Sequence, residues 1–117
     1  MIYGIGTDIE EIERFYKFFD KPNYLEKIYT QNEIEQFHNI NHPRKKAEFL
    51  ASRYVVKEAM SKALGVGISK EFSFKDIEVE KTELGKPYII YKDFICHLTI
   101  SHTKTTAVAF IVLEKKE

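Results

Sequence analysis

The sequence predicts an α+β fold in which a mostly antiparallel sheet packs against a long central helix. Two observations predict it. Helical apolar spacing dominates the first half of the chain after an N-terminal strand pattern, and from Phe74 onward the pattern changes to short strands. The chain has 117 residues, of which 44% are hydrophobic, and this is enough to fill one core. We therefore expect residues 1–117 to form a single domain.

The first half of the chain supplies one strand and three helices in this prediction. Residues 2–9 alternate as a strand, with Gly4, Gly6 and Asp8 on one face and larger side chains on the other. Residues 11–19 have helical spacing, and Thr30 followed by Glu33 has the spacing of a capping box that opens a short helix. The long helix is expected to start at Pro43 and to stop at Gly65.

The second half supplies the rest of the sheet. Strands are predicted at residues 74–81, 86–92, 96–101 and 107–113, with "ELGKP" and "HTKTT" as tight connections. Strands from both ends of the chain then join in one sheet.

Charge and cysteine content exclude several classes of protein. Eighteen basic and eighteen acidic side chains cancel, so no overall field recruits nucleic acid or an anionic membrane, and a charged partner must meet a local patch. One cysteine, Cys96, cannot form an internal disulfide, which fits a reducing cytoplasm. The N-terminus has neither a signal-peptide pattern nor a membrane span. We expect a cytoplasmic protein that binds neither nucleic acid nor membrane.

Glu58 and Lys62 stand one turn apart on the long helix, away from its main apolar side. Ala51 and Val55 lie close to Glu58 in angle, so this face is expected to be covered rather than fully solvated. Two interpretations remain open from the helix alone. The pair is either a surface ion pair at i, i+4 or a carboxylate and an ammonium that handle a divalent cation and a phosphate.

Asp8 is the candidate for a second carboxylate. It extends from a strand face on which two glycines leave room for a ligand or for another backbone. The glycines alone are also compatible with a bulge or with tight packing. His102 ends a strand pattern, where a structural histidine is the ordinary alternative, and the basic run Arg44, Lys45 and Lys46 could be a solvated helix start.

Three stretches together resemble a known family. "GIGTDIEEIERF", "FLASRYVVKEAMSKALG" and "LTISHTKTTAVAFIV", with "GKP" between the second and third, are similar to the motifs of the holo-acyl-carrier-protein synthases. These are the small type of 4′-phosphopantetheinyl transferase. The resemblance covers nearly the whole chain and implies the 4′-phosphopantetheinyl transferase fold.

The resemblance implies an enzyme of fatty acid biosynthesis. Such enzymes transfer the 4′-phosphopantetheine arm of coenzyme A to a serine of an apo acyl carrier protein, use Mg²⁺ and release adenosine 3′,5′-bisphosphate. It also implies a homotrimer with active sites between subunits. A non-catalytic module that binds coenzyme A or the carrier protein is the alternative, and a purely structural trimer is a second one.

The resemblance also assigns residues. Asp8 and Glu58 match the metal-binding acids, and Lys62 matches the lysine beside the phosphates. Arg14 and Lys17 match the region that meets the carrier protein. The residues implied for coenzyme A are Arg44, Lys45, Lys46, Arg53, Lys62, Gly65, Gly85, Pro87, His102 and Thr103. Tyr54, where the family usually has Phe or Trp, and Thr105, where an acid is common, are departures outside the metal and phosphate positions. The group that deprotonates the serine stays open among Glu58, a metal-bound water and a group from the carrier protein or solvent.

Overall fold

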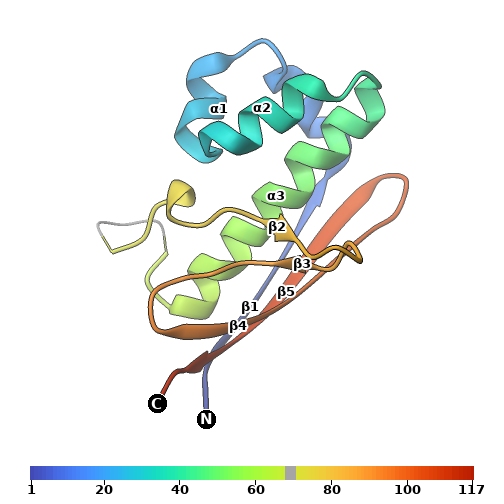
Figure 1. Ribbon diagram of the computed structural model, residues 1–117. Coiled ribbons are helices and arrows are strands. Elements are labelled where there is room, and N and C mark those ends of the chain that lie inside the picture. Colours follow the sequence, from blue (N-terminus) through green and yellow to red (C-terminus); the bar gives the residue numbers. More distant parts are fainter. Residues whose placement is uncertain (68–70) are drawn as a thin grey trace.

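The computed structural model describes residues 1–67 and 71–117 and has the predicted α+β arrangement (Figure 1). In chain order the elements are β1 (Ile2–Glu11), η1 (Ile12–Phe18), α1 (Pro22–Ile28), α2 (Gln31–Asn39), α3 (Pro43–Leu64), η2 (Phe74–Asp76), β2 (Glu80–Lys81), β3 (Pro87–Tyr88), β4 (Phe94–His102) and β5 (Thr106–Lys115), where η marks a 3₁₀-helix.

The main sheet has the strand order β1-β5-β4, and both pairs are antiparallel. Strand β5 is therefore central, and Ala109 pairs with Asp8 on one side and with Ile100 on the other. The short strands β2 and β3 form a separate hairpin, and the two chain ends lie close together (Figure 1). Strands from both ends of the chain join in this sheet, as predicted.

Helix α3 lies directly on β1 because two glycines allow it. A Cβ atom added to Gly4 would lie 2.0 Å from the carbonyl oxygen of Ala63, and one added to Gly6 would lie 2.0 Å from that of Ala59. Only glycine tolerates such an approach, because any other residue would place Cβ inside the helix backbone. Of the interpretations left open for these glycines, close approach of another backbone is observed at both, and the β1–β5 register also shifts between Ile2 and Gly4.

The limits of α3 agree with the prediction. Pro43 occupies its first turn, the ring of His42 accepts a hydrogen bond from the Arg44 amide, and Gly65 ends it with a φ of +79°. Ala51 and Val55 are fully buried, so the side of the helix near Glu58 is covered, as expected.

Helix α2 has the predicted capping box: the hydroxyl of Thr30 accepts from the Glu33 amide, and the Glu33 carboxylate accepts from the Thr30 amide. Two features differ from the prediction. Residues 12–18 form a 3₁₀-helix within the range expected to be an ordinary helix, and α1 was not predicted at all.

The predicted strands at 74–81 and 86–92 are much shorter in the structure. Residues 74–76 form a 3₁₀ turn, and the backbone groups of the following residues bond to side chains: the Ile77 carbonyl accepts from Lys57, and the Val79 amide donates to Glu33. These groups are thus unavailable to a neighbouring strand. After β3, Lys92 has a φ of +45° in a tight turn, which ends the extended run.

The face of the main sheet opposite α3 carries exposed apolar side chains. Ile5 and Ile9 of β1 are 59% and 64% exposed, and Phe110 of β5, which pairs with the residue between them, is 44% exposed. We call Ile5, Ile9 and Phe110 the outer apolar face. Among the helices of the two described stretches, none combines the length with the apolar character that crossing a membrane requires.

Candidate functional site

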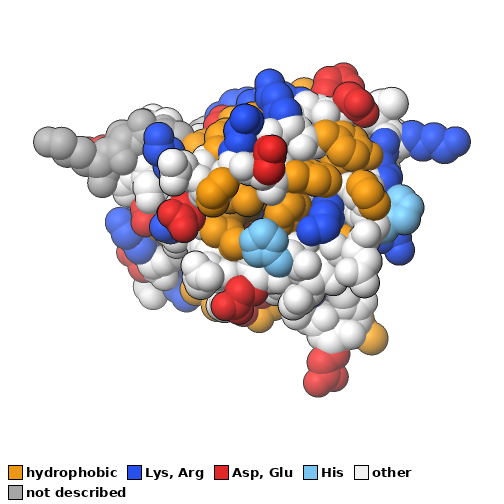
Figure 2. Space-filling model, turned by 90° about the horizontal axis from the view of Figure 1, so that it is seen from above, with side chains coloured by type: hydrophobic (Ala, Val, Ile, Leu, Met, Phe, Trp, Pro, Cys, Tyr) orange, Lys and Arg blue, Asp and Glu red, His pale blue; other side chains and the backbone are white. Residues whose placement is uncertain are grey.

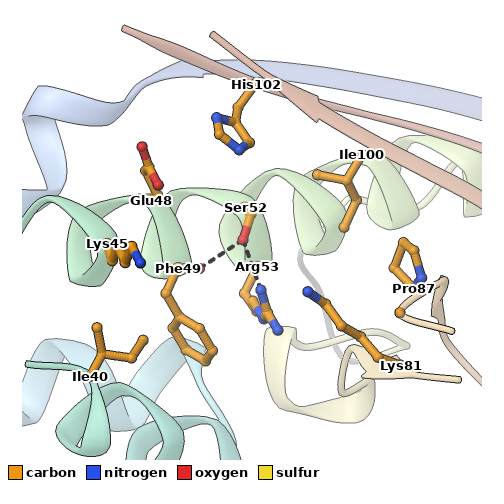
Figure 3. Close-up of a pocket in the computed structure, with 11 residues that line it drawn as sticks. Ile40, Lys45, Glu48, Phe49, Ser52, Arg53, Lys81, Pro87, Ile100 and His102 are labelled. Atoms are coloured by element: carbon orange, nitrogen blue, oxygen red, sulfur yellow. Dashed lines mark hydrogen bonds between the residues drawn. The ribbon is translucent and has the colours of Figure 1, made fainter. Parts of the chain in front are cut away.

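A cleft of about 400 Å³ opens between the first half of α3, the end of β4 and the β2–β3 hairpin (Figure 3). Its lining combines apolar side chains with basic ones: Ile40, Lys45, Glu48, Phe49, Ser52, Arg53, Lys81, Gly85, Pro87, Ile100 and His102. Figure 2 shows the end of the molecule at the top of Figure 1, where hydrophobic side chains gather at the centre with basic, acidic and histidine side chains around them. A cleft of this composition suits a ligand with both a ring and anionic groups.

Arg53 is the most constrained cation of the cleft. Its guanidinium carbon lies 4.1 Å from the centroid of the Phe49 ring, and Nη1 donates to the Ser52 hydroxyl at 3.0 Å (Figure 3). Its Nε is buried without a hydrogen-bond partner among the described residues. Burial lowers the pKa of Arg53, and the charge of Glu33 partly opposes this. A buried guanidinium with a free donor is suited to an anionic ligand.

Three more basic side chains line the cleft beside Arg53. Lys45 comes from the first turn of α3, Lys81 from β2 and His102 from the end of β4, and all three line the same cleft (Figure 3). The β2–β3 turn adds Gly85, whose φ of +88° requires glycine, and Pro87 follows it.

A second centre lies on β1. The Lys62 ammonium is 3.2 Å from Asp8 Oδ1 and 3.0 Å from the Thr7 carbonyl oxygen. The Asp8 side chain is only 10% exposed, and its other oxygen, Oδ2, is buried without a hydrogen-bond partner among the described residues. An unsatisfied buried carboxylate oxygen is costly unless a ligand satisfies it.

Glu58 belongs to the same region. Gly4 of β1 lies against Ala63 of α3 and Gly6 lies against Ala59, so two more residues of the strand bring Asp8 level with the preceding turn of the helix. Glu58 stands one turn before Lys62 on that helix, and its side chain is partly exposed. We call Asp8, Glu58 and Lys62 the Asp8 centre.

The Asp8 centre fits a hard divalent cation. Mg²⁺ is usually held by one or two carboxylates together with water and substrate phosphates rather than by a full protein cage. Residues 1–67 and 71–117 contain no cluster of three or more His, Cys, Asp or Glu side chains that could hold a metal alone. Oδ2 of Asp8, which has no hydrogen-bond partner among the described residues, is the atom that would bind such an ion.

The cleft and the Asp8 centre open on different sides of α3. Lys45 and Ser52 face the cleft, whereas Glu58 and Lys62 lie roughly 80–120° around the helix from Ser52 at 100° per residue. The sheet separates them too, because Asp8 is on the edge strand β1 and His102 is on the opposite edge strand β4.

Comparison with known proteins decides the family. The model of the "4'-phosphopantetheinyl transferase superfamily" matches residues 4–112 of the chain. The chain belongs to this superfamily. It is 49% identical over 116 residues to a holo-[acyl-carrier-protein] synthase of Staphylococcus aureus (strain Newman), and the match covers 98% of each chain.

Solved structures of the family agree. A holo-(acyl-carrier-protein) synthase of Bacillus anthracis in complex with CoA (3′,5′-ADP) matches with a TM-score of 0.90 and 45% identity, over 100% of this chain and 99% of that one. A Helicobacter pylori holo-[acyl-carrier-protein] synthase in complex with coenzyme A matches with a TM-score of 0.81 and 32% identity, over 94% and 99%. The predicted 4′-phosphopantetheinyl transferase fold is thus confirmed.

About half of the residues that the sequence resemblance implied for coenzyme A line the cleft. Those that line it are Lys45, Arg53, Gly85, Pro87 and His102. Lys62 belongs instead to the Asp8 centre, and Gly65 caps α3. Thr103 accepts hydrogen bonds from the amides of Thr105 and Thr106 and so shapes the turn after His102.

Two of the predicted basic residues lie outside the cleft lining. Arg44 pairs with Glu48 at 3.0 Å, and that glutamate itself lines the cleft. Lys46 donates to the Phe37 carbonyl at 3.2 Å and lies over the Phe37 ring. Of the basic run that begins α3, only Lys45 therefore lines the cleft.

Several lining residues were not singled out from the sequence. Lys81 stands in the mixed-charge run "EVEKT", which looks like an ordinary surface strand. Phe49 and Ser52 precede Arg53 on the same helix, and this neighbourhood of a ring, a hydroxyl and a guanidinium was the signal that could have identified them.

Arg14 and Lys17 lie on η1, close to the Asp8 centre in sequence. Arg14 pairs with Glu10, and its guanidinium carbon lies 5.4 Å from the Phe15 ring centroid and 5.3 Å from that of Tyr54. Lys17 is exposed, with its ammonium 5.3 Å from the Phe18 ring centroid. Glu10 was not predicted as a site residue, and burial together with the neighbouring Asp8 raises its pKa.

Proposed function

We propose that the chain is a holo-acyl-carrier-protein synthase. It transfers the 4′-phosphopantetheine group of coenzyme A to a serine of apo acyl carrier protein and releases adenosine 3′,5′-bisphosphate. The observation that carries the proposal is the basic cleft around Arg53, in a chain similar to holo-acyl-carrier-protein synthases that were solved in complex with coenzyme A.

The cleft is proposed to take the nucleotide end of coenzyme A. Arg53, Lys45 and Lys81 offer cations to the 3′-phosphate, and His102 offers a ring nitrogen. Gly85 and Pro87 provide a flat turn against which the adenine can lie. Arg44, Lys46 and Thr103 flank the cleft, where their charges and backbone shape support the same ligand.

The Asp8 centre is proposed to handle the pyrophosphate. Asp8 and Glu58 are the residues that would hold Mg²⁺, which when bound neutralises charge on the phosphates. Lys62 adds a second positive charge at the same place. The serine oxygen attacks the β-phosphorus, so the chain contributes mainly alignment and charge stabilisation.

The carrier protein is proposed to dock on η1. Arg14 is held by Glu10 and two aromatic rings, and Lys17 projects beside it, so the first helical segment offers cations from a rigid support. A local basic patch of this kind allows a chain without net charge to attract an acidic partner.

A homotrimer is proposed because one copy keeps the two centres apart. The outer apolar face gives each copy a surface for contact with another. A ring in which the β1 edge of one copy meets the β4 edge of the next would bring the Asp8 centre of the first beside the cleft of the second.

The proposal is tested by following nucleotide release. The protein is incubated with coenzyme A, Mg²⁺ and apo acyl carrier protein, and adenosine 3′,5′-bisphosphate is measured by chromatography. We expect its release to require all three components. The alternative, a non-catalytic module, predicts that coenzyme A raises the melting temperature while no bisphosphate appears.

A further inference from the structure

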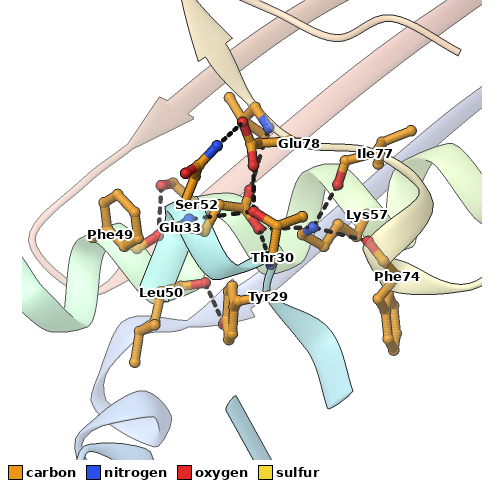
Figure 4. Close-up of polar contacts among 12 residues, drawn as sticks. Tyr29, Thr30, Glu33, Phe49, Leu50, Ser52, Lys57, Phe74, Ile77 and Glu78 are labelled. Carbon is orange, nitrogen blue, oxygen red and sulfur yellow. Dashed lines mark hydrogen bonds and ion pairs between the residues drawn. The ribbon is translucent and has the colours of Figure 1, made fainter. Parts of the chain in front are cut away.

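A fully buried ion pair joins α2 to α3. Glu33 of α2 and Lys57 of α3 are both 0% exposed, and Lys57 Nζ lies 2.9 Å from Glu33 Oε1 (Figure 4). Lys57 also donates to the carbonyl oxygens of Phe74 and Ile77, each at 2.8 Å. The ammonium thus uses its three protons on three acceptors, two of which belong to one stretch of backbone.

The carboxylate of the pair reaches the same stretch from the other side. Glu33 accepts from the Thr30 amide at 3.0 Å and from the Val79 amide at 3.2 Å. The neighbouring Glu78 accepts from the Thr30 hydroxyl and from the Asn32 amide group. Residues 74–79, which we call the strap, are therefore fixed by side chains of α2 and α3 at several backbone atoms (Figure 4).

Stability alone is a weak reason for such a pair. Taking two charges out of water costs about as much as their attraction returns, and apolar replacements of similar volume are often neutral or stabilising. An apolar pair cannot form directional hydrogen bonds to the backbone. Charged groups that bond to defined carbonyl and amide groups fix where the backbone runs.

The strap leads directly into the wall of the cleft. It continues into β2, where Lys81 lines the cleft together with Arg53 and points toward it (Figure 3). Arg53 stands one turn before Lys57 on α3, so the same stretch of helix supplies the cation of the cleft and the anchor of its wall. Residues 78–81 also line the hollow that adjoins the cleft and shares Arg53 and Phe49 with it.

We propose that Glu33 and Lys57 are positioning residues for coenzyme A binding. They fix the strap on α3 and so hold Lys81 at the distance from Arg53 that the ligand requires. Neither side chain lines the cleft, so both act through Lys81 and the strap. The inference rests on the proposed function, in that the ligand of the cleft is taken to be coenzyme A.

The experiment compares KM values for the two substrates. The double variant Glu33→Gln/Lys57→Met removes both charges and nearly keeps the side-chain lengths, so no single buried charge is left behind. We expect its KM for coenzyme A to rise about tenfold or more while its KM for the carrier protein stays within about twofold. Hydrogen exchange of the amides of residues 77–81 should become faster in the same variant.

Tyr29→Phe is the matched control. The Tyr29 hydroxyl donates to the Leu50 carbonyl at 2.7 Å, so this variant loses a buried hydrogen bond to α3 without touching the strap (Figure 4). It should lower the melting temperature and leave both KM values unchanged. A purely structural role for the pair predicts instead that the double variant and the control behave alike.

A second variant covers the case in which the double variant fails to fold. Glu78→Ala releases the strap from Thr30 and Asn32 and leaves the buried pair intact, and it should raise the KM for coenzyme A in the same direction but less. A normal KM for coenzyme A in either folded variant, or an equal rise of both KM values, would overturn the inference. Failure of the wild-type protein to bind coenzyme A would instead remove the proposed function, and the inference with it.

Discussion

At the scale of single residues, the most informative atom is Oδ2 of Asp8. Its partner oxygen is held by Lys62, while Oδ2 is buried and without a hydrogen bond among the described residues. A buried carboxylate in which one oxygen lacks a hydrogen bond lowers the stability of the fold. Such losses of stability are typical of functional sites. The other carboxylate proposed for the metal, Glu58, is partly exposed on the facing helix.

The first prediction concerns these two acids. Asp8→Asn and Glu58→Gln should each lower the turnover number by roughly a hundredfold or more, because each removes an anionic ligand of the cation that would stabilise the reacting phosphates. Both variants should fold normally, since the replacements keep shape and hydrogen-bonding capacity. Initial rates over a Mg²⁺ titration measure the effect, and wild-type turnover at saturating Mg²⁺ in either variant would contradict the metal assignment.

The second prediction concerns Tyr24, whose hydroxyl is buried without a hydrogen-bond partner among the described residues and whose ring stacks on Phe18. Burial, with help from the nearby Tyr54, raises the pKa of Tyr24 from 10.0 to about 12. A group with a raised pKa in the folded state contributes stability that is complete below the unfolded-state value of 10.0 and is lost as pH rises toward about 12. The free energy of unfolding should therefore fall in this alkaline range.

Tyr24→Phe removes the titrating group and keeps the ring. It should be neutral or stabilising by up to about 1 kcal/mol at pH 7, because the lost hydroxyl had no partner. It should also make the alkaline decline shallower without abolishing it, since burial raises the pKa of Tyr29 as well. Urea unfolding at several pH values measures both effects, and an unchanged decline would contradict the account.

At the scale of elements, the contact between β1 and α3 sets the geometry of the Asp8 centre. The sequence predicted the strand, the helix and its two ends, because alternation, helical spacing, Pro43 and Gly65 are local signals. It left open what the two glycines of β1 were for. The answer depends on a helix more than fifty residues away, which local patterns do not reveal.

The third prediction tests this contact. Gly6→Ala should destabilise the protein by about 3 kcal/mol, at the upper end for an overpacked site, because the added Cβ would lie 2.0 Å from the Ala59 carbonyl oxygen. The shift of α3 should also lower turnover by moving Lys62 away from Asp8. Gly67→Ala is the control, since no atom of the described residues lies within 4 Å of its added Cβ. Its φ of +65° makes the replacement cost about 1 kcal/mol, and turnover should stay unchanged. Equal stability losses and normal turnover in both variants would contradict the prediction.

The strands predicted at 74–81 and 86–92 show a second limit of local patterns. The alternation of Ile77 and Val79 was real, and both are buried, but their backbone partners are the side chains of Lys57 and Glu33 rather than a strand. Lys81 was overlooked because its place in the cleft depends on the tertiary contacts of the strap, which local patterns do not reveal. Residues in motifs, such as Asp8, Glu58 and His102, stood out in the sequence as candidates, and their roles stay predictions. Residues brought in by tertiary contacts did not stand out.

At the scale of the whole molecule, the question is whether one copy holds a complete site. The Asp8 centre lies on one edge strand and the cleft on the other, and they open on different sides of α3. The outer apolar face offers the surface through which copies could meet.

The fourth prediction follows from a site shared between copies. Asp8→Asn and Arg53→Gln variants, each impaired alone, should regain activity when they are mixed at equal amounts under conditions that exchange subunits. Random assembly leaves roughly a quarter of the shared sites with both native halves. Sedimentation would establish the trimer, and a mixture no more active than its two components would place both halves in one chain.

The central claim is that this chain transfers phosphopantetheine from coenzyme A. The most direct test is the intact mass of apo acyl carrier protein after incubation with the protein, coenzyme A and Mg²⁺, with EDTA and Asp8→Asn as parallel controls. The account predicts a mass gain of one phosphopantetheine that is absent with EDTA and strongly slowed in the variant. An unchanged carrier mass, with coenzyme A still bound to the protein, would contradict it.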